Sequence, residues 1–140
     1  MLNAIFLPIK PDYSERIMTG EKVFEYRKKL PKQDVDYVVV YASSPHKKVV
    51  GYATIRRFHT LVSDELWRLT KEHSGISREF FDSYFIGMES ASAIELVDVM
   101  RFVNPFDPDK VLGERKVPQS FCYLTRGEMN KLKRRKACPV

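Results

Sequence analysis

A helix, a glycine stop and a charged strand follow one another near the start of the chain, and this succession constrains the fold more than any other feature. Pro11 and Asp12 suit the first turn of a helix, and Gly20 is a natural stop at its C-terminal end. The residues after the glycine have the character of a strand, from Lys22 to Arg27. Because the chain reverses at the glycine, we expect the charged side chains of this region to lie around one turn, and we look for function there.

Composition favours one domain. The chain has 140 residues, a mass of 16.4 kDa and 44% hydrophobic residues, enough to bury a single core. No apolar run approaches the length of a membrane span, and the first residues lack the pattern of a signal peptide, so we expect a cytoplasmic protein that does not contact a membrane. The two cysteines, Cys122 and Cys138, have neither disulfide-framework nor metal-ligand spacing, and we expect no metal and no cofactor. The oligomeric state does not follow from the sequence.

The net charge of +6 is unevenly distributed. Residues 1–61 and residues 125–140 each carry five more basic than acidic residues, whereas residues 62–124 carry four more acidic than basic ones. Such an asymmetry is typical of a basic protein with one face toward nucleic acid, although scattered lysines on a solvated surface would give the same count.

Local patterns predict more strands than helices. The expected strands cover residues 3–9, 22–27, 36–42, 48–58, 92–103 and 120–124. The expected helices follow Pro11, Ser63, Ser77 and Thr125, the last with a capping box. Gly51 predicts a bulge within its strand. Apolar residues at helical spacing after Ser77 predict a stripe that packs into the core, namely Phe81, Tyr84, Phe85 and Met88.

Alternation in the charged strand separates its side chains onto two faces. If Phe24 and Tyr26 point into the core, Glu25 and Arg27 face outward into a groove, and Lys22 at the turn can reach either side. A carboxylate two residues from a guanidinium can hold the arginine fork in position for a phosphate or a nucleobase edge. The alternative is an ion pair that only ties the strand to the helix.

The string Gly20-Glu21-Lys22-Val23-Phe24-Glu25-Tyr26-Arg27 resembles the signature of the ASCH domain, a family of the PUA-like superfamily. That signature has a glycine, a lysine, a glutamate and an arginine at these four spacings. The resemblance extends to residues 7–11, 38–43, 50–53 and 118–121. It implies an α+β fold, a PUA-like mixed β-barrel with flanking helices, over residues 3–124, followed by a basic C-terminal helix or tail over residues 125–140.

The resemblance also implies that the partner is RNA or a nucleotide-like ligand, and a binding module is the favoured interpretation. In this hypothesis cations meet phosphate or base, Glu25 orients them or accepts from a base amino group, and a tyrosine stacks. The basic tail adds affinity that falls with salt. The candidate RNA- or ligand-binding residues are Lys10, Lys22, Glu25, Arg27, Tyr26, Tyr41, Ser43, Lys133, Arg134 and Arg135.

Two other functions stay open. One ASCH branch resembles amidohydrolases that act on acetylated cytidine with a lysine, a threonine nucleophile and a glutamate; Lys22 matches the lysine, but Glu25 stands where the threonine would be. Lys22 and Glu25 are nevertheless candidate catalytic residues, an acid and a base for a hydrolase such as a ribonuclease acting on RNA. The third hypothesis is a protein-interaction module like those of transcriptional coactivators.

Overall fold

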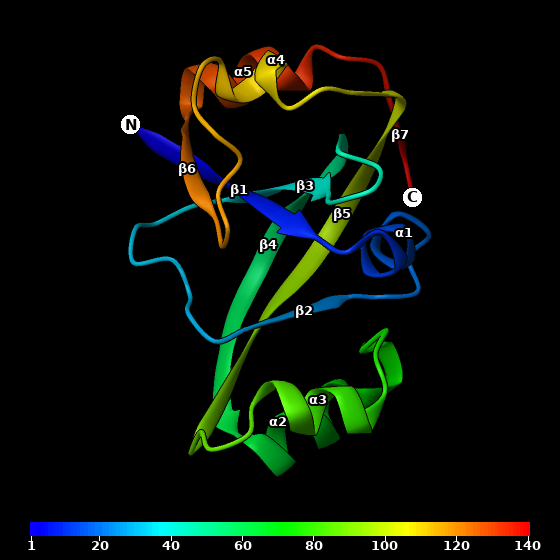
Figure 1. Ribbon diagram of the computed structural model, residues 1–140, viewed down its shortest axis with the longest axis vertical. Helices are drawn as coiled ribbons and strands as arrows, with labels where there is room; N and C mark the ends of the chain where they lie inside the picture. The colour runs from blue at the N-terminus through cyan, green and yellow to red at the C-terminus, as the bar shows by residue number, and fades with distance from the viewer.

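Seven strands form one mixed sheet in the computed structural model, which describes all 140 residues (Figure 1). The strands are β1 (Leu2–Ile9), β2 (Phe24–Arg27), β3 (Tyr37–Ala42), β4 (Lys48–Val62), β5 (Ser90–Phe106), β6 (Cys122–Thr125) and β7 (Ala137–Pro139). The helices are α1 (Pro11–Met18), α2 (Ser63–Thr70), the short 3-10 helix η1 (Lys71–His73), α3 (Arg78–Tyr84), α4 (Asp109–Leu112) and α5 (Arg126–Lys133). None of these helices combines the length and the apolar character needed to cross a bilayer.

The sheet runs in the order β2-β5-β4-β3-β1-β6, with β7 paired to β5. Only β1 and β3 run parallel, and the remaining pairs are antiparallel. Strands β4 and β5 form a long hairpin, and α2 and α3 lie at its far end (Figure 1). The expected α+β fold with flanking helices is confirmed. The sheet itself is open, with β2 and β6 at its two ends, so the closed barrel implied by the resemblance is absent.

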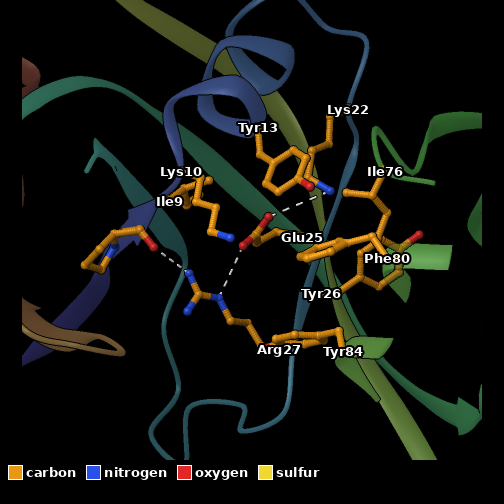
Figure 2. A pocket seen from close by; sticks show the side chains of 11 residues that line it. Ile9, Lys10, Tyr13, Lys22, Glu25, Tyr26, Arg27, Ile76, Phe80 and Tyr84 are labelled. Carbon is orange, nitrogen blue, oxygen red and sulfur yellow. Dashed lines mark hydrogen bonds and ion pairs between the residues drawn. The ribbon is translucent and has the colours of Figure 1, made fainter. Parts of the chain in front are cut away.

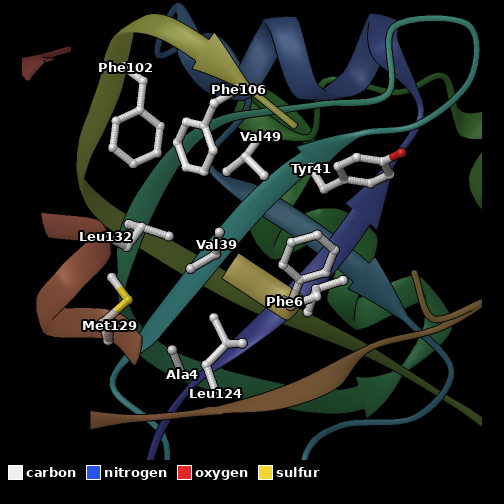
Figure 3. Packing of buried hydrophobic residues seen from close by; sticks show 11 residues of the cluster. Ala4, Phe6, Val39, Tyr41, Val49, Phe102, Phe106, Leu124, Met129 and Leu132 are labelled. Atoms are coloured by element: carbon white, nitrogen blue, oxygen red, sulfur yellow. The ribbon is translucent and has the colours of Figure 1, made fainter. Parts of the chain in front are cut away.

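Alternation along β1 and β3 divides the buried side chains between two core clusters. Phe6 and Val39 belong to the cluster that α5 covers, shown in Figure 3. Leu7 and Val40, one position further along each strand, belong to the cluster on the other face, which also packs against α1. A third cluster, centred on Phe81, joins α2 and α3 to β2. The helices therefore cover different faces and ends of one sheet.

Most predicted elements are present, with differences at their ends. Strands β4 and β5 extend past the predicted ranges, and η1, α4 and β7 were not predicted. Ser77 and Thr125 cap their helices as expected, and Thr125 forms the capping box, whereas α2 begins at Ser63 with Val62 in the cap position. The predicted core stripe is only partly buried, since Met88 keeps 38% of its surface exposed.

Gly51 lies at a shift in the pairing register, as predicted, and its backbone is closely approached. The pairing of β4 with β5 shifts between Val49 and Gly51. A Cβ at Gly51 would lie 2.4 Å from both the carbonyl oxygen of Met100 and the Sδ of Met18. Only glycine therefore lets α1 and β5 approach β4 at this point.

Candidate ligand-binding pocket

A pocket of about 180 Å³ lies among the end of β1, helix α1, strand β2 and helix α3 (Figure 2). Its walls combine charged side chains from the segment around β2 with aromatic rings from α1, β2 and α3. The lining residues are Pro8, Ile9, Lys10, Tyr13, Lys22, Glu25, Tyr26, Arg27, Ile76, Phe80 and Tyr84. Four of the sequence-predicted charges, Lys10, Lys22, Glu25 and Arg27, thus share one pocket with Tyr26.

The turn between α1 and β2 is fixed to the segment that precedes α3. Gly20 has a φ of +85°, which permits the reversal after α1. The backbone N–H of Val23 then donates to the carbonyl oxygen of His73 at 2.9 Å, and Arg16 Nη1 donates to the carbonyl oxygen of Gly75 at 2.7 Å. These bonds place Lys22 between two segments that are about fifty positions apart in the sequence.

Lys22 is buried at the pocket, and only 1% of its side chain is exposed. Its Nζ donates to the carbonyl oxygen of Ser74 at 2.5 Å and lies 3.8 Å from Oε1 of Glu25. It also lies 4.9 Å from the ring centroid of Tyr26, within the range of a cation–π contact. Burial lowers the pKa of Lys22 to about 8, although the Glu25 charge opposes this. Lys22 can therefore exchange a proton near neutral pH.

Glu25 lies between two cations. Its Oε1 faces Lys22, and its Oε2 lies 3.3 Å from Nε of Arg27. Both distances exceed the roughly 2.8 Å of a strong charge-assisted hydrogen bond, so the carboxylate oxygens keep capacity to accept from a ligand. Arg27 Nη2 donates to the carbonyl oxygen of Pro8 at 2.7 Å, which ties β2 to β1, while its buried Nε has no hydrogen-bond partner.

Tyr26 holds one wall of the pocket rigidly. Its hydroxyl shares a buried hydrogen bond of 2.6 Å with Oγ1 of Thr70, which in turn donates to the carbonyl oxygen of Leu66 in α2. Burial raises the pKa of Tyr26 to about 12, so the hydroxyl stays protonated at neutral pH. The ring packs edge-on against Phe81 of the third core cluster. Tyr26 thus links the pocket to α2 and α3.

Aromatic residues that the sequence reasoning did not select form the outer wall. Tyr13 and Phe80 have ring centroids 5.4 Å apart, and Phe80 stacks with Tyr84 at 6.2 Å. Exposed lysines accompany these rings, Lys10 at 5.6 Å from the centroid of Phe80 and Lys28 at 5.0 Å from that of Tyr84. The sequence could have indicated this aromatic wall, because Phe80 and Tyr84 are four positions apart and therefore lie on one face of the helix.

The other predicted binding residues lie outside this pocket. Tyr41 is buried against Phe6 in the first core cluster, where burial and the charge of Asp107 raise its pKa. Ser43 follows β3, and its backbone N–H donates to the carbonyl oxygen of Ile9. Neither side chain lines the pocket.

The basic C-terminal residues lie at the other end of the molecule from α3, where α5 covers the sheet (Figure 1). Lys133 Nζ donates to the hydroxyl of Tyr37 at 2.5 Å, and the guanidinium of Arg135 lies 3.8 Å from the ring centroid of Phe106. Arg134 is exposed just after the helix. The structure therefore separates these three cations from the charges around β2.

Comparison with known proteins identifies a family and proteins of similar structure. The ASCH domain model matches residues 7–106. An ASCH domain-containing ribonuclease of Zymomonas mobilis subsp. mobilis is 27% identical over 125 residues, which span 87% of this chain and 84% of that protein. The crystal structure of ASCH from Zymomonas mobilis has a TM-score of 0.84 at 23% identity, covering 97% of this chain and 96% of that one. The N-terminal domain of Staphylothermus marinus McrB has a TM-score of 0.58 at 12% identity, with 95% and 94% covered. The two structural likenesses show a shared fold.

Proposed function

Because this chain belongs to the ASCH domain family, we propose that it binds RNA, or a nucleotide-like ligand, by taking one base into the pocket beside β2. The observation that carries this proposal is the composition of the pocket wall. Three cations and a carboxylate face the same space of about 180 Å³ as four aromatic rings. This volume is below the roughly 300 Å³ at which pockets for drug-sized ligands begin, and it suits a single base.

The chemistry of the wall matches an unstacked nucleotide. Aromatic rings such as Phe80 and Tyr84 offer faces on which a base can stack. Lys10 is exposed at the pocket and can meet the phosphate, whereas the buried Lys22 and the partly buried Arg27 can meet polar atoms of the base. A net charge of +6 and a pI near 9.3 favour a polyanionic partner, and the relative named a ribonuclease supports RNA as its class.

Fluorescence anisotropy with a labelled single-stranded RNA, repeated over a series of salt concentrations, tests the proposal. The Lys10→Ala variant should bind more weakly and should reduce the slope of log K against log salt by about 0.7, because one phosphate contact is lost. Lys116→Ala is the matched control, since Lys116 is exposed in the segment between α4 and β6. Equal losses in both variants, or no binding by the wild type, would contradict the proposed site.

RNA cleavage is a second candidate function. It is favoured by the pKa of about 8 for Lys22, whose Nζ lies 3.8 Å from Glu25, and by the name of the ribonuclease relative. In this mechanism Glu25 accepts the proton of a ribose 2′-hydroxyl, the 2′-oxygen attacks phosphorus, and the 5′-oxygen leaves with a proton from Lys22. The product is a 2′,3′-cyclic phosphate.

Mass spectrometry of RNA after incubation with the purified protein tests this mechanism. New cyclic phosphate ends should appear with the wild type and disappear with Lys22→Ala. An intact RNA pool would leave binding as the function of the pocket, and cleavage that persists in the variant would place the chemistry elsewhere.

A further inference from the structure

Four charged side chains line the pocket, and three of them, Lys22, Glu25 and Arg27, follow one another in the order donor, acceptor, donor (Figure 2). Lys22 and Arg27 flank Glu25, with Nζ 3.8 Å from its Oε1 and Nε 3.3 Å from its Oε2. The side chains of Lys22, Glu25 and Arg27 are 1%, 10% and 14% exposed. Because water is largely excluded from these groups, a ligand must supply complementary hydrogen-bonding atoms or leave them unmatched.

All three groups retain hydrogen-bonding capacity. An ammonium has three donors, and Lys22 directs one of them to the carbonyl oxygen of Ser74. Arg27 directs Nη2 to the carbonyl oxygen of Pro8, and its buried Nε faces Glu25, whereas its Nη1 makes no hydrogen bond within the protein. The remaining donors of this guanidinium are therefore available to an acceptor on a ligand.

Among the RNA bases, only uracil presents the complementary edge. Its O4, N3–H and O2 read acceptor, donor, acceptor, whereas cytosine reads donor, acceptor, acceptor and guanine reads acceptor, donor, donor. We infer that the pocket selects uracil, with N3–H donating to Glu25 and the two carbonyl oxygens accepting from Lys22 and Arg27. This inference rests on the proposed function, and it adds the identity of the base.

Selection against cytosine follows from repulsion as well as from lost bonds. Cytosine would place the lone pair of N3 against the Glu25 carboxylate and an amino group against one of the flanking cations. A buried site built to accept a hydrogen bond rejects a ligand that lacks the donor. The rings of Tyr13 and Phe80 supply stacking, which every base can use, so they contribute affinity but no selectivity.

Binding of labelled homopolymers of about eight nucleotides tests the inference, with oligouridine, oligocytidine, oligoadenosine and oligo(N3-methyluridine) as probes. Oligouridine should bind at least about tenfold more tightly than oligocytidine, as expected for a good bidentate base contact. N3-methylation replaces the donor with a methyl group and leaves both carbonyl oxygens in place. The methylated oligomer should therefore lose the whole advantage of uridine.

The Glu25→Gln variant changes the central group from acceptor only to acceptor and donor. Its amide can donate to N3 of cytosine, so the preference for uridine over cytidine should fall by about tenfold or more. Glu21→Gln is the matched control, because Glu21 lies in the same turn with 65% of its side chain exposed, and it should keep the wild-type preference. Thermal melting reports whether each variant is folded. If Glu25→Gln does not fold, binding of the N3-methylated oligomer to the wild-type protein still tests whether the pocket recognises N3–H of uracil.

The outcomes separate the two proposals. If no oligomer binds, RNA binding and uracil selection both fail. If all oligomers bind equally and Lys10→Ala still weakens them, RNA binding stands and uracil selection is overturned. Preference for cytidine, or tight binding of the N3-methylated oligomer, also overturns uracil selection.

Discussion

Replacement of Lys22 by methionine should stabilise the folded protein at neutral pH. Methionine is unbranched and apolar, so it can fill the space of the lysine stem without placing a charge there. Only 1% of the Lys22 side chain is exposed. Burial lowers the pKa of Lys22 from 10.5 to about 8, with the Glu25 charge opposing the shift. The wild-type protein therefore spends folding free energy to keep this group protonated.

The size and pH range of that free energy follow from the two pKa values. Below pH 8 Lys22 is protonated in both the folded and the unfolded chains. The difference between its folded pKa of about 8 and its ordinary pKa of 10.5 then corresponds to about 3 kcal/mol of destabilisation of the folded state. Between pH 8 and 10.5 the unfolded chain binds more protons than the folded one, so stability rises with pH. From pH 7 to pH 9.5 the gain is about 2 kcal/mol. Loss of the hydrogen bond to Ser74 offsets about 1 kcal/mol, which leaves Lys22→Met about 2 kcal/mol more stable at pH 7.

Urea unfolding of both proteins at pH 7 and at pH 9.5 measures these quantities. The difference between the two pH values is compared between wild type and Lys22→Met, so that contributions from all other titrating groups cancel. From pH 7 to pH 9.5 the free energy of unfolding of the wild type should rise by about 2 kcal/mol more than that of Lys22→Met. Parallel changes in the two proteins would refute the reasoning, because they would mean that Lys22 remains charged in the folded state at pH 9.5.

Two further predictions concern packing around the pocket and at the C-terminus. Gly75 and Gly113 have φ values of +65° and +64°, but only at Gly75 would a Cβ lie 2.6 Å from the Lys22 side chain. The free energy of unfolding of Gly75→Ala should therefore be about 1–3 kcal/mol lower than that of Gly113→Ala, and Gly75→Ala should also bind RNA less tightly. Equal stability of the two variants would contradict the clash with Lys22. Deletion of residues 126–140 removes the buried Met129 and should lower the free energy of unfolding by about 4 kcal/mol or more. Urea denaturation measures this loss, and a truncated chain of wild-type stability would refute the prediction.

The charged half of the pocket could be predicted because its residues are close in sequence. Lys22, Glu25 and Arg27 follow one glycine turn, and a short strand holds them within a few residues of one another. Helix ends were predictable for a similar reason, since Ser77 and Thr125 make their capping bonds within three residues. Local chemistry determines both features.

The aromatic half depends on contacts between distant segments. The stripe after Ser77 was interpreted as core, which holds for Phe81 and Phe85, but Tyr84 lines the pocket because α3 presents a second face to α1. Tyr41 was selected as a candidate stacking residue, whereas alternation along β3 turns it toward Phe6 in the core. Periodicity assigns residues to faces, but only the pairing of whole strands decides what each face meets.

The segment from His73 to Gly75 receives hydrogen bonds from Val23, Lys22 and Arg16, which join the far end of the β4–β5 hairpin to the turn after α1. The α1–β2 side and the α3 side of the pocket therefore come from different parts of the chain, and these three bonds, together with Tyr26 and the third core cluster, fix the spacing between them. Insertions or substitutions in that short connection would widen or narrow the opening while every ligand-contacting side chain stayed the same. In the evolution of such a fold, ligand size can consequently change independently of hydrogen-bonding specificity.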